Sequence, residues 1–303
     1  MSNNAPSSFI TAVSTVSDYL SNMQVVMVNT TLPANIGSAA RAMHTMGLSR
    51  LTVVDPKLPI DDTSVSHAAG GSDLLSSAII APTLESAIAD CQLVFAASSR
   101  SRHLPRPVVT PTQAAKLMLD FIDKQNAINE RNGIDTAPNI AILFGREDRG
   151  LTNEELAYAD YHIQIDANPA YPVLNVASAV QVIASFIYAY TQTHIQADSE
   201  DNNIAQVTDN VETLELETLG QGMLEQGMLN TYVRQQWDEP AITQQQLQQL
   251  TERITALMVQ RKLADSENLK SLPSRLSRLG SRIQLDQKEY QLLSALIAKL
   301  LRD

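Results

Sequence analysis

Short apolar runs recur along the first two thirds of the chain, and amphipathic segments separate them. The runs are short and almost free of polar residues, which is typical of strands buried on both faces of a parallel sheet. Six of them are predicted to be strands: Val25–Val28, Leu51–Val54, Ile79-Ile80, Leu93–Ala97, Ile140–Phe144 and Tyr161–Ile165.

Helix signals lie between these runs. The predicted helices are Ile36–Met46, Ser64–Ala69, Thr83–Asp90, Pro111–Lys124 and Val176–Thr193. Asn35 is a suitable N-cap for the first helix, and Gly47 would end it. Thr152 and Glu155 have the spacing of a capping box, which starts one more helix. The alternation of strands and helices predicts an α/β fold with a mainly parallel sheet and helices on both faces.

The two ends of the chain differ from this pattern. Residues 1–22 are a polar extension, 23–193 the α/β domain, 194–246 an acidic, glutamine-rich linker or insertion, and 247–303 a helical extension. Leu247–Leu263 and Gln287–Leu301 carry the helical patterns of that extension, which has no strand signal, so we expect a small all-α C-terminal domain. Gln125–Pro138 is predicted to be a polar linker within the α/β domain.

Composition narrows the class of protein. The chain has 303 residues, of which 44% are hydrophobic and 18% charged, as expected for a globular protein. The single cysteine, Cys91, excludes an internal disulfide and a cysteine-built metal site, and the five histidines show no ligand spacing, so no metal is expected. A net charge of −11 argues against a general nucleic-acid coat and leaves room for a local basic patch.

No segment predicts membrane insertion or export. Met1–Asn22 lacks the basic region and the unbroken apolar core of a signal peptide. The most apolar long segment, Val173–Tyr190, is interrupted by Asn175 and Gln181 and is better explained as a buried helix. We therefore expect a cytoplasmic protein with no membrane contact.

The first candidate site follows the strand Ile140–Phe144. Gly145 ends the strand, four charged residues Arg146–Arg149 form a turn, and Gly150 closes it. This order delivers glycine and charge to the carboxyl edge of the sheet, where open α/β folds bind ligands. An ordinary turn with solvated charges explains the spacing equally well.

A second candidate is the start of the first helix. Gly37 and Arg41 are four residues apart and share a helix face, so Arg41 is predicted to lie over Gly37 beside the free amides of the helix start. Such a place suits a phosphate or an oxyanion; the alternative is a solvated arginine. No G-x-G-x-x-G follows the first strand and no G-x-x-x-x-G-K-[ST] occurs, which disfavours a Rossmann dinucleotide fold and a P-loop.

Two basic segments are candidate RNA contacts. One is the loop with Arg100, Arg102 and Arg106, and the other is Lys270–Arg282 in the tail. Positive side chains in such loops can bind RNA phosphates, although a solvated loop is as plausible for the first. Asn175 opens the long helix after a proline-stiffened loop, where capping alone would explain it.

The motifs taken together, in this order, resemble those of the SPOUT methyltransferases. They are Asn-x-Gly-x-x-x-Arg at residues 35–41, Leu-Phe-Gly-Arg-Glu-x-x-Gly-Leu-Thr-Asn-Glu-Glu at residues 143–155, and Leu174-Asn175. The TrmJ-type tRNA ribose 2′-O-methyltransferases are the most similar subfamily. The resemblance covers residues 23–193 and extends over 247–302. It implies a C-terminal trefoil knot, S-adenosylmethionine as cofactor, a homodimer joined through the knot helices, and tRNA rather than DNA as partner.

The resemblance also assigns roles to residues. Arg41 would act in catalysis near the partner's cofactor, with Asn35 and Glu147. The cofactor would bind Ala97, Ser98, Ser99, Gly145, Ile165, Val173, Leu174 and Asn175, and RNA would bind Arg100, Arg102, Arg275, Arg278 and Arg282. Val173 departs from the pattern, since many relatives carry serine there.

The implied reaction is methylation of a cytidine or uridine ribose in the tRNA anticodon loop, at position 32. An rRNA ribose methyltransferase and an inactive RNA-binding relative are the alternatives.

Overall fold

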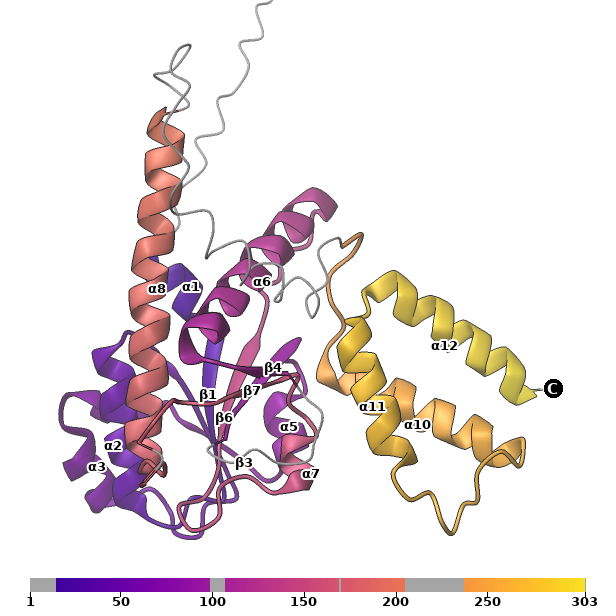
Figure 1. Cartoon of the computed structure of the whole chain (residues 1–303), viewed down its shortest axis with the longest axis horizontal. Coiled ribbons are helices and arrows are strands. Elements are labelled where there is room, and N and C mark those ends of the chain that lie inside the picture. Colours follow the sequence, from indigo (N-terminus) through magenta and orange to yellow (C-terminus); the bar gives the residue numbers. More distant parts are fainter. Residues whose placement is uncertain (1–14, 99–106, 169, 205–236, 303) are drawn as a thin grey trace, which may run out of the picture.

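The described residues of the computed structural model are 15–98, 107–168, 170–204 and 237–302, and they contain one seven-stranded parallel sheet (Figure 1). The strand order is β3-β2-β1-β6-β4-β7-β5. The strands are β1 (Met23–Val28), β2 (Arg50–Val54), β3 (Ile79–Ala81), β4 (Leu93–Ala97), β5 (Val108–Val109), β6 (Ile140–Phe144) and β7 (Tyr161–Ile163).

Strand β1 lies inside the sheet, because β2 pairs with it on one side and β6 on the other. Val25 is aligned with Leu51 of β2 and with Ile142 of β6. All six residues of β1 are buried. Side chains alternate between the faces of a strand, so Val25 joins the larger core cluster and Val26 the smaller one. Burial on both faces explains why the strands read as unbroken apolar runs.

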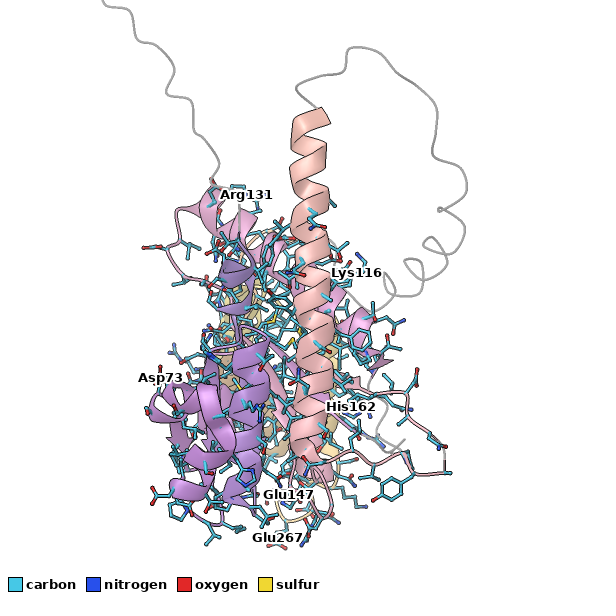
Figure 2. The ribbon with its side chains drawn as sticks, turned by 90° about the vertical axis from the view of Figure 1, so that its left-hand side faces the viewer. Asp73, Lys116, Arg131, Glu147, His162 and Glu267 are labelled. Carbon is cyan, nitrogen blue, oxygen red and sulfur yellow. The ribbon has the colours of Figure 1, made fainter. Side chains whose placement is uncertain are left out.

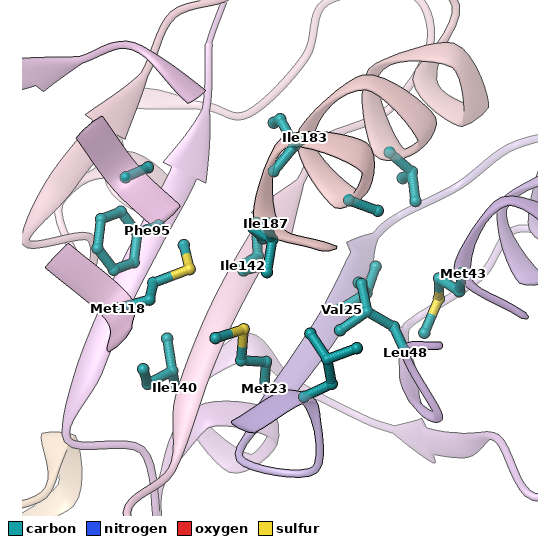
Figure 3. Close-up of a cluster of buried hydrophobic side chains, with 14 of the residues drawn as sticks. Met23, Val25, Met43, Leu48, Phe95, Met118, Ile140, Ile142, Ile183 and Ile187 are labelled. Carbon is teal, nitrogen blue, oxygen red and sulfur yellow. The ribbon is translucent and has the colours of Figure 1, made fainter. Parts of the chain in front are cut away.

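Helices cover both faces of the sheet. Four helices pack on the face of the larger cluster: α1 (Val16–Leu20), α2 (Pro33–Thr45), α6 (Pro111–Asn132) and α8 (Val176–Ile204). Three shorter elements pack against α2, namely α3 (Asp62–Ala68), the 3-10 turn Ala69–Gly71 and α4 (Ser72–Ser76). On the other face lie α5 (Leu84–Ile88) and α7 (Asn153–Leu156). Figure 3 shows Ile183 and Ile187 of α8 close to Ile142 of β6. Each such buried side chain stabilises the fold by about 1.5–3 kcal/mol.

A separate helical unit follows at the C-terminal end. It consists of α10 (Gln244–Gln260), α11 (Leu272–Ile283) and α12 (Gln287–Arg302) around its own small apolar cluster. The Gln244 amide donates to the Cys91 carbonyl at 2.8 Å, and the Ala241 amide donates to Oε1 of the buried Gln125 at 2.8 Å. The unit is therefore bound to the segment that precedes β4 and to α6.

The structure confirms the parallel α/β class and the helical C-terminal region, and it corrects several boundaries. Residues 1–22 are not polar throughout, since α1 buries Tyr19 and Leu20. The segment 125–138 is not a linker, because α6 continues to Asn132 and ends at Gly133 in the left-handed conformation. Residues 194–246 are not a linker where they are described: α8 extends to Ile204, and Trp237 is buried against Phe121. The two-residue strand β5 carries no pattern that the sequence could reveal.

Two expectations concern the path and the surroundings of the chain. The trefoil knot stays a prediction. Within the described part of the chain, no helix combines the length and the apolar character that a membrane crossing requires.

Candidate functional site

A cavity lies at the carboxyl edge of the sheet, where three separate segments meet. The end of β4 contributes Ala97 and Ser98, the turn after β6 contributes Gly145 to Gly150, and the segment between β7 and α8 contributes Ile165 and Pro172–Leu174. The structure thus brings together most of the predicted cofactor residues. Ser99 lies outside the described residues.

The turn after β6 is held closed by its own backbone. The Gly150 amide donates to the Arg146 carbonyl at 2.8 Å, and Gly150 has a φ of 68°. A Cβ atom on Gly145 would lie 2.2 Å from the Gly150 carbonyl carbon, so no side chain fits there. The close approach of Gly145 to Gly150 therefore fixes the shape of this turn, whose residues Gly145 to Gly150 line the cavity. The predicted capping box is present, with the Glu155 amide donating to Thr152 Oγ1.

Glu147 connects this turn to the segment that follows β1. Its carboxylate accepts hydrogen bonds from Thr31 Oγ1 at 2.6 Å, from the Thr31 amide at 3.0 Å and from Asn35 Nδ2 at 2.7 Å. A weaker contact comes from the Leu32 amide at 3.4 Å. Burial alone would raise the pKa of Glu147, but the hydrogen bonds from Thr31 and Asn35 outweigh it, and the pKa ends below its ordinary value. Glu147 is therefore a carboxylate at neutral pH that orients its neighbours, and it is a poor proton acceptor.

Asn35 connects Glu147 to Asn175. Its Oδ1 accepts from Asn175 Nδ2 at 3.2 Å, while Asn175 Oδ1 accepts from the Ala177 amide at 2.8 Å in the first turn of α8. Figure 2 shows Glu147 near the amino end of α8. The prediction that Asn35 is an N-cap is wrong, because α2 begins at Pro33 and Leu32 is its N-cap. Asn35 instead lies in the first turn, where its buried side chain is free to point toward Glu147.

The predicted position of Arg41 over Gly37 is also wrong, and the binding of an anion by Arg41 stays a prediction. The Glu147 carboxylate lies beside the amino end of the helix, where it accepts from the amides of Thr31 and, more weakly, Leu32, and where the helix dipole favours a negative charge. Arg41 does not lie over Gly37: a Cβ on Gly37 would be 2.0 Å from the Ser64 carbonyl oxygen of α3. Gly37 thus permits close contact between two helices.

Arg41 is exposed on α2 and is not part of the cavity lining of its own chain. Among the described residues, its guanidinium makes no hydrogen bond or ion pair. Its predicted action at the cofactor of a partner subunit stays a prediction.

The predicted RNA contacts divide into two groups. Arg100 and Arg102 lie outside the described residues. Arg275, Arg278 and Arg282 lie on α11, where Arg275 and Arg282 are exposed and Arg278 is half-buried. Their spacing places them on one face of the helix.

Comparison with known families assigns the chain to a class. The family described as SpoU rRNA Methylase matches residues 22–185, which is more than half of the chain. The chain belongs to the SpoU rRNA methylase family. The match spans the whole parallel sheet, the cavity and the first part of α8.

Relatives within the SpoU family are named as tRNA (cytidine/uridine-2′-O-)-methyltransferase TrmJ. One from Cronobacter sakazakii is 44% identical over 165 residues, which cover 54% of this chain and 62% of the relative. One from Citrobacter koseri is 38% identical over 215 residues, which cover 70% of this chain and 81% of the relative. The aligned part of the chain thus spans less than two thirds of the Cronobacter relative.

Two solved structures share the fold. TrmJ from Z. mobilis superposes with a TM-score of 0.66 at 23% identity, over 91% of this chain and 98% of that one. A probable methyltransferase from Bordetella pertussis gives a TM-score of 0.52 at 34% identity, over 58% of this chain and 99% of that one. The parallel sheet is thus that of the SpoU family, and the first match extends through the helical C-terminal unit.

The sequence motifs did not reveal every residue of the site. Thr31, which gives Glu147 two hydrogen bonds, lies in a predicted loop with no distinguishing pattern. Arg146, in the same turn as Glu147, donates a hydrogen bond to Asn29, which follows β1. Arg146 is one of four consecutive charged residues in the turn. Its position in the sequence does not distinguish it from the exposed Arg149.

Proposed function

We propose that this chain is an S-adenosylmethionine-dependent RNA methyltransferase that modifies a ribose 2′-oxygen in the anticodon loop of tRNA. The observation that carries the proposal is the cavity at the carboxyl edge of the sheet. The predicted cofactor residues Ala97, Gly145 and Val173 come from three distant segments and line this one space. The names of the relatives supply the choice of tRNA and of a pyrimidine nucleotide.

The lining of the cavity supports the proposed cofactor. Ile163, Ile165 and Leu174 offer apolar walls for an adenine ring, and the glycine turn offers backbone groups for its polar edge. Val173 is 52% exposed and lines the same space, so a hydroxyl from the serine common in relatives is replaced by an apolar contact. S-adenosylmethionine, when bound, supplies an activated methyl group on a sulfonium. What remains for the protein is to align the reactants.

The residues of this chain have separable tasks in the proposal. Glu147 fixes the turn 145–150 relative to α2 through its hydrogen bond with Asn35. Asn35 also accepts a hydrogen bond from Asn175, which connects Asn35 and Glu147 to the start of α8. Arg41, exposed on α2, would face the cavity of a second subunit in a homodimer. There it would bind the phosphate beside the target ribose and stabilise negative charge on the 2′-oxygen. It would not act as the base, because arginine keeps its proton.

The arginines of α11 are proposed to extend the RNA surface. Ser274 and Ser277, on another side of the same helix, face a cleft that also contains Glu154 and Glu252. RNA would therefore approach the arginine side and avoid the acidic cleft. Each phosphate contact adds to the salt dependence of binding.

The test is methylation in vitro. Purified protein is incubated with labelled S-adenosylmethionine and unmodified tRNA or rRNA, and the labelled nucleotide is mapped by nuclease digestion and mass spectrometry. We expect a single 2′-O-methylated pyrimidine in the anticodon loop, and no label in a tRNA with a 2′-deoxy nucleotide there. Label in rRNA alone would replace the tRNA assignment. Cofactor binding without transfer to either RNA would refute the proposed activity.

A further inference from the structure

Arg146 and Glu147 are adjacent in the cavity turn, but their side chains hold different parts of the fold. Glu147 binds Thr31 and the start of α2. Arg146 Nη2 donates to Glu155 Oε1 at 2.6 Å and to Asn29 Oδ1. The side chains of Arg146 and Glu155 are only 12% and 15% exposed, so this ion pair is largely withdrawn from water.

Both partners of Arg146 are themselves fixed. Glu155 Oε2 accepts from the Thr152 amide at 2.6 Å, which ties it to the start of α7. Asn29 follows β1 directly: its amide donates to the Val54 carbonyl at 2.8 Å, and its Nδ2 donates to Asp55 Oδ2 at 2.7 Å. Arg146 thus joins the turn to the ends of β1 and β2 on one side and to α7 on the other.

The other two charged residues of the turn are exposed. Asp148 and Arg149 pair with each other at the surface, with side chains 55% and 68% exposed, and such pairs contribute little to stability. The hydrogen bond between Gly150 and Arg146 closes the turn but does not attach it to the sheet. Arg146 and Glu147 therefore connect the turn to segments that are distant in sequence, while the buried Leu151 packs into the core at the end of the turn.

We propose that Arg146 is a positioning residue for the cofactor cavity. Its hydrogen bonds to Glu155 and Asn29 fix the position of the turn 145–150 relative to the sheet. They therefore also fix the position of the cavity wall that this turn forms. The inference rests on the proposed function in one respect, that the ligand of this cavity is S-adenosylmethionine. Both bonds come from Nη2, whose two hydrogens point in fixed directions within the plane of the guanidinium. The hydrogens of a lysine ammonium rotate on a flexible stem, so lysine would hold the same two acceptors less rigidly.

The experiment measures cofactor affinity of the full chain by titration calorimetry with S-adenosylmethionine alone. Arg146→Gln should weaken binding about tenfold or more, since it removes a buried charged hydrogen bond and leaves the Glu155 carboxylate without its cation. Arg146→Lys should recover part of that loss. Asn29→Ala should weaken binding by a smaller factor, and Arg146→Gln combined with Glu155→Gln should cost less than the sum of the two changes.

Lys288→Gln is the matched control. Lys288 pairs with Glu239 at the same N–O distance of 2.6 Å, but at the helical C-terminal unit. Its loss should leave cofactor affinity unchanged.

A second readout separates this inference from the proposed function. Hydrogen exchange of the turn 145–150 in the cofactor-free protein should accelerate in Arg146→Lys and Asn29→Ala, and stay unchanged in Lys288→Gln. If the wild type binds no S-adenosylmethionine, the proposed function fails while exchange still tests the role of Arg146. Wild-type affinity in Arg146→Gln overturns the inference. If that variant does not fold, wild-type exchange and affinity in Arg146→Lys and Asn29→Ala overturn it instead.

Discussion

Replacing Glu147 with glutamine tests the connection between the cavity turn and α2. The substitution keeps the shape of the side chain but exchanges one carboxylate oxygen for an amide that donates. Oε2 faces the Thr31 amide and Oε1 faces the Leu32 amide and Asn35 Nδ2. Either orientation of the glutamine therefore sets its NH₂ group against a backbone N–H.

The size of the effect follows from these contacts. Two N–H donors that face each other without an acceptor cost about 1–3 kcal/mol. Loss of the carboxylate charge weakens the remaining hydrogen bonds of residue 147 by about 1 kcal/mol. Because Glu147 is partly exposed, water recovers some of this, and we expect a net loss of about 2 kcal/mol in the free energy of unfolding. For a chain of 303 residues, that lowers the Tm by roughly 3 °C, measured by differential scanning calorimetry at neutral pH.

The pH dependence gives the prediction a second test. The pKa of Glu147 is lowered in the folded state. Its stabilisation is therefore present above the unfolded value of about 4.3 and is lost as pH falls through the folded pKa. The difference in Tm between wild type and Glu147→Gln should shrink in that acidic range. Glu154→Gln, which removes an exposed charge in the first turn of α7, is the control and should lower the Tm by less than Glu147→Gln does. Equal Tm values for wild type and Glu147→Gln at neutral pH would refute the reasoning.

Three further changes probe other parts of the chain. Arg41→Ala should keep the affinity for S-adenosylmethionine, because Arg41 does not line the cavity of its own chain and is proposed to bind RNA, not the cofactor, at the cavity of the partner subunit. It should lose most methyl transfer to tRNA, and normal turnover would exclude its proposed role. Gly37→Ala should lower the Tm by several degrees, or prevent folding, because its Cβ would collide with the Ser64 carbonyl. Burial raises the pKa of the Cys91 thiol to about 12, so iodoacetamide at about pH 8 should label Cys91 only in unfolded protein, as read by mass spectrometry; rapid labelling of the folded chain would contradict its buried position.

Motif order along the chain was a better guide to the cavity than any single residue type. Ala97, Gly145 and Val173 were assigned to one site by resemblance, and the structure places them around one cavity. Arguments from local helix geometry were less successful. Asn35 has the residue type of an N-cap, but α2 starts earlier, at Pro33. The side chain of Asn35 therefore does not cap the helix and donates a hydrogen bond to Glu147 instead.

The sequence by itself determined six of the seven strands, the capping box at Thr152 and the class of the fold, because these depend on periodicity and on residues that are close together in the chain. The partners of the charged turn were decided only by the tertiary structure. Glu147 meets Thr31 across 116 positions and Arg146 meets Asn29 across 117, because β1 and β6 are adjacent in the sheet and end at the same edge. A helix terminus that looks vacant in the sequence is therefore filled by a carboxylate from a distant loop, and strand order, which no local pattern encodes, is the physical reason.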